Sequence, residues 1–150
     1  MSKDLTPNLW FNGNAKEAVE FYLSIFPDSK IISTIYYPHE GLADFQKEMA
    51  GKVLTIEFEL MSNRFVAINA GPEFTFNESV SFSIPCKDQA EIDYYWEKLS
   101  AVPESEQCGW CKDKYGLSWQ VVPENMEELM SRPNAFPHLM EMKKIIVENF

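Results

Sequence analysis

Two cysteines three residues apart are the first candidates for chemistry in this sequence. Cys108 and Cys111, in "CGWC", have the spacing of a zinc knuckle or a redox-active dithiol. A dithiol needs a nearby helix N-terminus to lower a thiol pKa, and a zinc site needs two more ligands. A turn, "KDKYG", and a strand, "LSWQVVP", follow instead, while Cys86, His39 and His138 are scattered. We therefore expect both cysteines in a hairpin strand, with their sulfurs on opposite faces and no metal or redox role.

The two histidines are weaker candidates. His39 lies beside Glu40 in a long loop, where it is either a solvated residue or part of a flap that closes over a ligand. His138 precedes the last predicted helix and is expected to be a cap or surface residue. The sequence offers no Ser-His-Asp set and no phosphate-binding loop.

Composition restricts the class of protein. A chain of 150 residues with 45% hydrophobic and 14% aromatic residues predicts one compact domain with a substantial core. The formal charge of −10 disfavours nucleic acid and anionic membranes as partners, because both would repel it. No apolar run approaches the roughly 20 residues of a membrane span. "MSKDLTPNLW" lacks the apolar core of a signal peptide, and the three cysteines are too few for a disulfide scaffold, so we expect a cytoplasmic protein with reduced thiols.

Alternation and capping patterns predict two similar halves and a helical tail. The first half has strands over 6–11, 30–37, 52–60 and 65–71, a helix opened by Asn14, and a loop or flap over 38–51. The second half has strands over 79–85 and 117–123 and a helix opened by Asp88 with Glu91 three residues later. Two C-terminal helices are expected over 124–131 and 138–150.

The halves read as copies of one module. A shift of 73 residues pairs "VEFYL" (19–23) with "IDYYW" (92–96), and a shift of 51 pairs "FVAINAGP" (65–72) with "GLSWQVVP" (116–123). We predict an α+β fold in which two βαβββ modules, about 5–75 and a shortened copy at about 78–125, form an incomplete barrel around a cavity. Residues 126–150 form the C-terminal helical tail of this single domain.

Strand alternation assigns each side chain to the module's helix or to the cavity. The helix-facing set is the more apolar and comprises Leu9, Phe11, Val66, Ile68, Phe82, Ile84, Trp119 and Val121. The cavity-facing set mixes polar groups with aromatics and comprises Asn8, Trp10, Ala67, Asn69, Ser81, Ser83, Ser118 and Gln120. A lining of this kind suits a ligand pocket, because a buried amide without a partner is costly.

The predicted ligand-binding residues are Asn8, Trp10, Asn69, Ser81 and Gln120. Asn69 and Gln120 have an alternative interpretation as amides that bridge strands. Phe65 and Trp110 are further candidates for the lining, although aromatic residues on strands more often belong to the core.

Two carboxylates on the strand 52–60 depend on its register. Glu57 and Glu59 alternate with apolar residues and are expected to face solvent. With the opposite register they would face the cavity, where a carboxylate would allow catalysis.

Four stretches resemble the vicinal oxygen chelate superfamily, which contains glyoxalases, extradiol dioxygenases, and bleomycin- and fosfomycin-resistance proteins. They are "LTPNLWFNGNAKEAVEFYLSIFPDSKI", "SVSFSIPCKDQAEIDYYWEKLS", "CGWCKDKYGLSWQVVPENMEELM" and "EMKKI", and within the superfamily they are most similar to the PhnB-like group. Members of this group often carry the label 3-demethylubiquinone methyltransferase. No Gly-rich nucleotide-binding loop supports that label here.

The resemblance also implies where a metal ion would be held. In the superfamily's metalloenzymes the ligands come from the first and last strand of each module, which correspond here to Asn8, Asn69, Ser81 and Gln120. The family has His and Glu at these positions, and neutral oxygens hold a divalent transition metal poorly by comparison. We therefore expect no metal or other cofactor, and no glyoxalase or dioxygenase activity by the usual route.

A small-molecule binding protein is the predicted function, with a small organic molecule as its partner. The alternative is an enzyme of the same superfamily that acts on a small metabolite with an atypical metal or none, and a thiol-redox protein is a weaker third possibility. The resemblance implies a homodimer, whose modules come from one chain or are exchanged between two.

Overall fold

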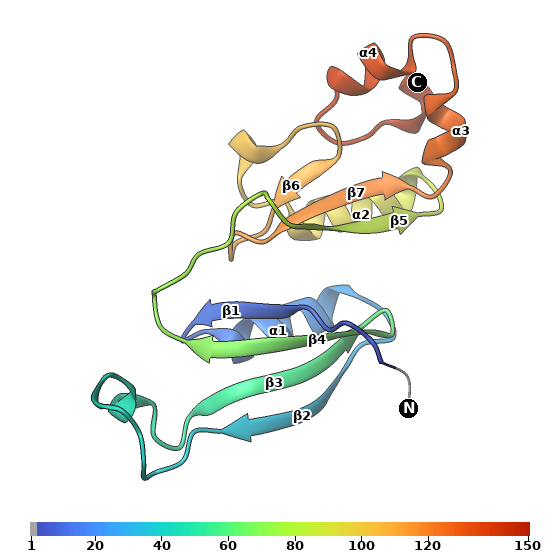
Figure 1. Ribbon diagram of the computed structural model, residues 1–150. Coiled ribbons are helices and arrows are strands. Elements are labelled where there is room, and N and C mark those ends of the chain that lie inside the picture. Colours follow the sequence, from blue (N-terminus) through green and yellow to red (C-terminus); the bar gives the residue numbers. More distant parts are fainter. Residues whose placement is uncertain (1–2) are drawn as a thin grey trace. The chain divides into compact units, whose positions relative to one another are not determined.

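The computed structural model describes residues 3–150, which form two compact units (Figure 1). Unit 1 ends at Thr75 and unit 2 begins at Phe76. Each unit combines one sheet with one long helix, and unit 2 continues into short C-terminal helices. This is the mixed α+β architecture that the sequence predicts.

Unit 1 contains a four-stranded sheet in the order β1-β4-β3-β2. β1 is parallel to β4, and the other neighbours are antiparallel. Its elements are β1 (Asn8–Asn12), α1 (Ala15–Ile25), β2 (Lys30–Tyr36), the 3-10 helix η1 (Asp44–Met49), β3 (Val53–Leu60) and β4 (Asn63–Ala70).

α1 covers one face of this sheet. The helix buries Ala18, Val19, Tyr22 and Ile25, which recur at helical spacing, and Pro27 follows its end. This stripe packs against the side chains that β1, β3 and β4 turn toward the helix, among which Leu9, Phe11, Ile56, Phe58, Phe65 and Ala67 are buried. Burial of these apolar side chains is the main stabilisation of unit 1.

Unit 2 contains a three-stranded sheet in the order β5-β7-β6, with β5 parallel to β7. Its elements are β5 (Ser81–Cys86), α2 (Gln89–Leu99), the 3-10 helix η2 (Pro103–Ser105), β6 (Trp110–Lys112) and β7 (Ser118–Pro123). The Asp88 carboxylate accepts a hydrogen bond of 2.9 Å from the backbone N–H of Glu91, which confirms the predicted N-cap of α2. The described part of unit 2 has no counterpart of β2, so the second module is shortened as expected.

A buried carboxylate organises the turn between β6 and β7. Asp113 accepts hydrogen bonds from the backbone N–H groups of Tyr115 (2.8 Å) and Leu117 (3.1 Å). It also accepts one of 2.9 Å from the indole Nε1 of Trp119. These bonds satisfy a carboxylate that is fully shielded from solvent, and they fix the hairpin that presents β7.

The strand pairing corrects the predicted register of the repeat. Leu9 lies beside Ala67 in unit 1, and Phe82, 73 residues after Leu9, lies beside Trp119 in unit 2. β4 and β7 therefore correspond with a shift of 52 residues, not 51. Because side chains alternate faces, this single residue exchanges the two faces of β4.

The C-terminal segment differs from the prediction. α3 (Met126–Met130) agrees with the first expected helix, but the second, α4 (Ala135–Met140), begins and ends early. Beyond it, backbone N–H groups of Cys108 and Gly109 donate to the carbonyls of Met142 and Lys143. The chain thus forms no helix between α4 and the 3-10 helix η3 (Val147–Asn149), because the turn before β6 binds its backbone at this point. No helix within residues 3–150 has the length and apolar character needed to span a membrane.

Candidate functional site

The sheet face opposite α2 carries the polar side chains that the sequence assigns to the cavity. Ser81 pairs with Ser118, and Ser83 pairs with Gln120, so all four lie on this face. Phe82, Ile84, Trp119 and Val121 take the other face, toward α2, as predicted.

Ser81 and Gln120 form a hydrogen-bonded pair across two strands. The Nε2 of Gln120 donates to the Oγ of Ser81 at 2.9 Å. Both side chains are half-buried. Within residues 3–150 the Oε1 of Gln120 has no hydrogen-bond partner, so it can accept a bond from a bound molecule.

The hydroxyl of Ser118 is buried without a partner. The residue is 1% exposed, and among the described residues nothing pairs with its Oγ. A buried hydroxyl that makes no hydrogen bond costs roughly 1–3 kcal/mol. A bound molecule or water that reached this group, beside Ser81 in the strand register, would recover that energy.

The face of unit 1 opposite α1 carries Asn8 and Trp10. Asn8 is exposed, and its Nδ2 donates to the carbonyl of Thr6 at 2.9 Å. Trp10 is half-buried; its Nε1 donates to the carbonyl of Gly71 at 2.9 Å, and its ring meets Phe74 edge-on at 4.8 Å between centroids. Trp10 is therefore held in place and offers its ring as an apolar surface.

Asn69 lies on the opposite face from Asn8, which corrects the predicted lining. It pairs with Phe11 and points toward α1. Its Oδ1 accepts from the backbone N–H of Ala15 at 3.1 Å, and its Nδ2 donates to the carbonyl of Val53 at 2.9 Å. Asn69 is thus an amide that bridges strands and a helix start. Ala67 also points toward α1. Val66 and Ile68 therefore lie on the face opposite α1, where Ala67 and Asn69 were expected.

Glu57 and Glu59 take the alternative of the two registers considered for β3 and lie on the face of the sheet opposite α1. Glu57 pairs with Val66, and Val66 with Asn8, so Glu57 shares the face of Asn8; Glu59 shares it too. The Oε1 of Glu57 lies 3.0 Å from the Nε of Arg64, and its Oε2 accepts from the Oγ of Ser33 at 3.3 Å. Its side chain is 30% exposed. A carboxylate fixed in this way can bind a cationic or hydroxyl group, or accept a proton.

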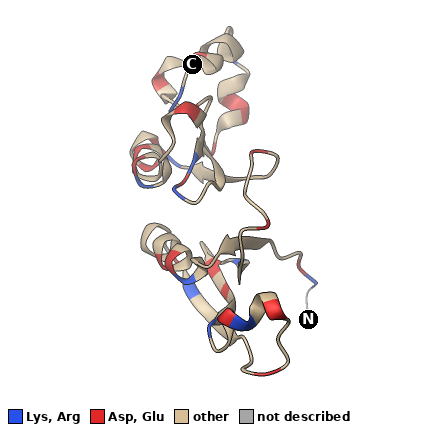
Figure 2. Cartoon of the chain, turned by 90° about the vertical axis from the view of Figure 1, so that its left-hand side faces the viewer, with Lys and Arg blue, Asp and Glu red and all other residues tan. Residues whose placement is uncertain are grey.

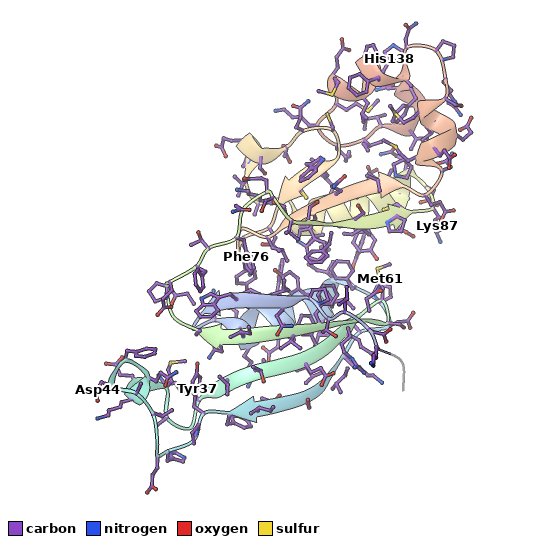
Figure 3. The ribbon with its side chains drawn as sticks, in the orientation of Figure 1. Tyr37, Asp44, Met61, Phe76, Lys87 and His138 are labelled. Carbon is purple, nitrogen blue, oxygen red and sulfur yellow. The ribbon has the colours of Figure 1, made fainter. Side chains whose placement is uncertain are left out.

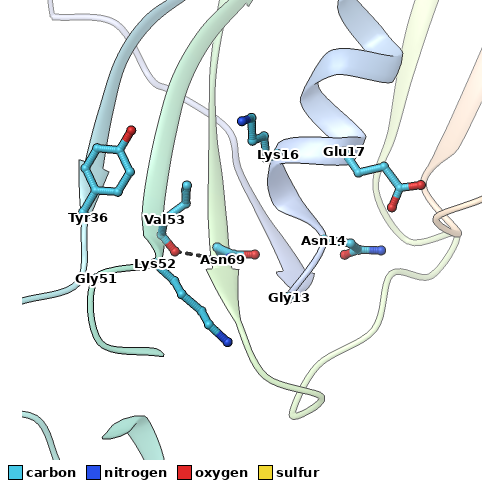
Figure 4. A pocket seen from close by; sticks show the side chains of 9 residues that line it. All are labelled: Gly13, Asn14, Lys16, Glu17, Tyr36, Gly51, Lys52, Val53 and Asn69. Atoms are coloured by element: carbon cyan, nitrogen blue, oxygen red, sulfur yellow. Dashed lines mark hydrogen bonds between the residues drawn. The ribbon is translucent and has the colours of Figure 1, made fainter. Parts of the chain in front are cut away.

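A pocket of about 450 Å³ opens at the start of α1 (Figure 4). Of the predicted ligand-binding residues, Asn69 alone belongs to its lining, and its amide is already committed to Val53. Lys16 and Lys52 also line the pocket but extend in different directions, so they do not converge on one anion. Sequence alternation gave no signal for this pocket, because turn residues such as Gly13 and Gly51 form much of its wall.

The cysteines lie partly as predicted. Cys111 is buried in β6, and burial raises its pKa to about 12, so its thiol stays protonated. Cys108 precedes the strand, in a turn with φ of +52°, and its Sγ lies 3.6 Å from the Sδ of Met140. Burial likewise raises the pKa of Cys86 to about 12. Within residues 3–150, no three His, Cys, Asp or Glu side chains are arranged to share a metal ion.

Both histidines are exposed. His39 lies at the base of the 38–51 loop, where its ring packs over Gly51. Backbone bonds between Tyr37 and Lys52 (2.8 Å) and between Gly51 and Tyr37 (3.1 Å) close the loop, which carries η1 beyond the ends of β2 and β3 (Figure 3). His138 lies on α4, within that helix and not before it.

Comparisons with known proteins agree with this architecture. The family model described as 3-demethylubiquinone-9 3-methyltransferase matches residues 3–122. A PhnB protein from Bacillus cereus is 32% identical, over 80% of this chain and 99% of that chain, with a TM-score of 0.63. A comparison with curated protein sequences gives no match.

Two more distant structures show the fold alone. A Pseudomonas aeruginosa protein is 19% identical, over 81% of this chain and 98% of that chain, with a TM-score of 0.59. The fosfomycin resistance protein FosX from Mesorhizobium loti is 13% identical, over 88% of this chain and 100% of that chain, with a TM-score of 0.55. The chain therefore belongs to the PhnB-like family described as 3-demethylubiquinone-9 3-methyltransferase, and it has the vicinal oxygen chelate fold.

Proposed function

We propose that this protein binds a small organic molecule through neutral polar groups. The observation that carries the proposal is the half-buried Ser81–Gln120 pair, in which the Gln120 Oε1 makes no hydrogen bond within residues 3–150. The Ser81 hydroxyl and the Gln120 Oε1 could both hydrogen-bond one molecule, whereas the Ser118 hydroxyl beside them is closed off from solvent. Neutral donors and acceptors of this kind fix the orientation of an uncharged or weakly polar ligand.

In unit 1, Asn8 and Trp10 lie on the face of the sheet opposite α1, and we propose them as ligand contacts of that unit. The Trp10 ring, held by Gly71 and Phe74, supplies an apolar contact at little entropic cost because it is already ordered. Asn69 would act indirectly, by holding β4 against α1, since both ends of its amide are bonded within unit 1.

Binding without the superfamily's metal ion follows from the donors at the four corresponding positions. Asn8, Ser81 and Gln120 offer uncharged oxygens, and the corrected register places the apolar Ile68, not Asn69, at the fourth position. Divalent transition metals are held in proteins by imidazole, thiolate or carboxylate groups. These side chains therefore do not fit such an ion, and sequestration of the ligand requires none.

An enzyme acting on a small metabolite is the second candidate, and Glu57 favours it. Its carboxylate shares a face with Asn8 and Trp10, and Arg64 and Ser33 fix both of its oxygens. In this candidate function Glu57 serves as the proton acceptor or as the anchor of a cationic group. Methyl transfer, which the family description names, is not part of the proposal, because the sequence has no Gly-rich nucleotide loop.

Mass spectrometry of small molecules released from natively purified protein tests the first candidate. We expect one organic compound from the wild type and from the matched control Ser83→Ala, whose exposed hydroxyl lies on the same face. Gln120→Ala should release about two- to tenfold less, as the loss of one hydrogen bond predicts. Equal release from Gln120→Ala, or no compound from the wild type, would contradict the proposal.

Glu57→Gln separates the two candidates once a compound is known. The amide keeps the shape of the side chain and removes its proton-accepting carboxylate. A binding protein keeps the compound unchanged in both forms. An enzyme converts it in the wild type and fails to do so in Glu57→Gln.

A further inference from the structure

Two sulfur atoms from separate segments of unit 2 lie in contact near the surface. The Sγ of Cys108, in the turn before β6, lies 3.6 Å from the Sδ of Met140, the last residue of α4. Met140 is 47% exposed and Cys108 is half-buried, so a small ion can reach the pair from solvent. The sequence gave no signal for this contact, because its spacing pairs Cys108 with Cys111 and not with a methionine 32 residues later.

Backbone and amide hydrogen bonds hold the two sulfur-bearing segments together. The N–H of Cys108 donates to the carbonyl of Met142 at 2.8 Å. The Nε2 of Gln107 donates to the carbonyl of Met140 at 2.7 Å and to the Sγ of Cys108 at 3.3 Å. The segments are therefore in place before any ligand arrives, which lowers the entropic cost of binding one between the two sulfurs.

We propose that Cys108 and Met140 together bind one Cu(I) ion. Thiolate and thioether sulfurs are soft ligands of the kind that Cu(I) selects, whereas Mg²⁺, Ca²⁺ and Mn²⁺ prefer oxygen. A metal–thiolate bond is about 2.3 Å long in zinc sites, and two sulfurs on one ion can be separated by up to twice such a length. The observed 3.6 Å lies within that limit and corresponds to a bent arrangement, which leaves room for a third ligand from solution.

The surroundings of the pair favour Cu(I) over Zn²⁺, the other common partner of thiolates. Structural Zn²⁺ sites use four ligands, and within residues 3–150 no three His, Cys, Asp or Glu side chains are arranged to share an ion. Cys86 and Cys111 are buried, and burial raises the pKa of each to about 12, so their thiols stay protonated and do not compete for the ion.

Binding requires no change of oxidation state. The Cys108 sulfur exchanges its proton for the ion, the proton passes to water, and the Met140 thioether donates a lone pair. The site shares no residue with the Ser81–Gln120 pair, so the inference goes beyond the proposed function, and Gln120→Ala should leave it intact.

Anaerobic titration of the full chain with Cu(I), held by a coloured chelator that competes for the ion, tests the proposal. We expect the wild type to take one equivalent from the chelator and Cys108→Ser to take none. Met140→Leu keeps the size of the side chain and should bind at least about tenfold more weakly, because a second ligand on the same protein acts at a high effective concentration. Met49→Leu, at a half-buried position on η1 in unit 1, is the matched control and should bind as the wild type does.

X-ray absorption at the copper edge gives a second measurement, in a buffer without added thiol. The loaded wild type should show two sulfur neighbours of the ion, and loaded Met140→Leu should show one. A wild type that takes up no Cu(I), or whose ion has a single sulfur neighbour, overturns the proposal. Equal affinities of the wild type and Met140→Leu, or equal weakening by both leucine variants, overturn it too.

Discussion

The side-chain amide of Asn69 joins three segments of unit 1. It connects β4 to the first helical N–H of α1 at Ala15 and to the start of β3 at Val53. The nearby hydroxyl of Tyr37 donates to the Asn69 carbonyl at 2.7 Å, and burial, with a smaller effect of the Glu73 charge, raises the pKa of that tyrosine. These bonds satisfy backbone groups that would otherwise be buried unpaired where helix and sheet meet.

Replacing this amide should destabilise the fold. Asn69→Leu removes a donor and an acceptor and leaves the Ala15 N–H and the Val53 carbonyl unpaired. We expect a loss of about 2–4 kcal/mol in the free energy of unfolding, measured by urea denaturation. Asn8→Leu, at an exposed position on the opposite face, should change it by less than about 0.5 kcal/mol. Equal effects of the two variants would show that Asn69 has no bridging role.

At the scale of elements, Gln89 connects the C-terminal segment to α2 by two hydrogen bonds, beside the Lys144–Asp93 ion pair. The Nε2 of Gln89 donates to the carbonyl of Ile145 at 2.9 Å, and its Oε1 accepts from the N–H of Val147 at 2.8 Å. Ile145 is fully buried and packs over Gly109, where a Cβ would lie only 2.8 Å from its Cδ1. Glycine at 109 is therefore needed both for this contact and for its φ of +88°.

Removing the amide should loosen this segment locally. Gln89→Leu loses both bonds to the tail, while the backbone bonds from Cys108 and Gly109 to the tail remain. We expect the Val147 amide to exchange about fivefold faster, since a lost hydrogen bond contributes about 1 kcal/mol. The backbone amides of α1 in unit 1 serve as the internal reference. Unchanged exchange at Val147 would contradict the proposed attachment.

The sequence predicts these elements correctly where the apolar periodicity is strong. It fails where a shift of one residue changes the strand register. α1, α2 and the paired strands follow from apolar spacing, and Asp88 marks its helix correctly. The register of β4 was wrong because a Pro-on-Pro match suggested a shift of 51, whereas only strand pairing reveals 52. The tail was predicted as a helix because its local pattern contains no signal for the bonds from Cys108 and Gln89.

The candidate site, too, was predicted correctly only where strand alternation is regular. Ser81 and Gln120 could be placed together from the sequence, because alternation along β5 and β7 is regular. The strand pairing corrected the faces of two residues. Asn69 was expected in the cavity lining but lies toward α1, and Glu57 was expected to face solvent but shares the face of Asn8. The buried state of the Ser118 hydroxyl depends on packing, which no local pattern encodes.

Across the whole molecule, acidic residues outnumber basic ones and are spread over both units (Figure 2). Some of them are paired. The hydrogen bond from Lys144 is the main cause that lowers the pKa of Asp93, and the one from Lys112 does the same for Glu78. A carboxyl with a lowered folded pKa stabilises the protein above its unfolded pKa, and this contribution disappears as the pH falls through the folded value.

Acid should therefore destabilise the fold in a way that depends on Asp93. As the pH falls from neutral through the usual carboxyl range near about 4 and below, we expect the unfolding midpoint in urea to decrease. Asp93→Asn should start lower at neutral pH and lose less on acidification, because its contribution is already absent. Glu97→Gln, an exposed change on the same helix, is the control. An Asp93→Asn profile parallel to that of the wild type would contradict the assignment.

Isothermal titration of the protein with Mn²⁺, Ni²⁺ and Zn²⁺, in the wild type and in Gln120→Ala, tests the central claim most directly. Because Asn8, Ser81 and Gln120, which the resemblance assigns to metal-ligand positions, carry uncharged side chains, we expect no one-to-one binding of any of these ions, and identical weak heats in both proteins. One-to-one binding in the wild type that Gln120→Ala abolishes would show a metal centre at this site and contradict the account.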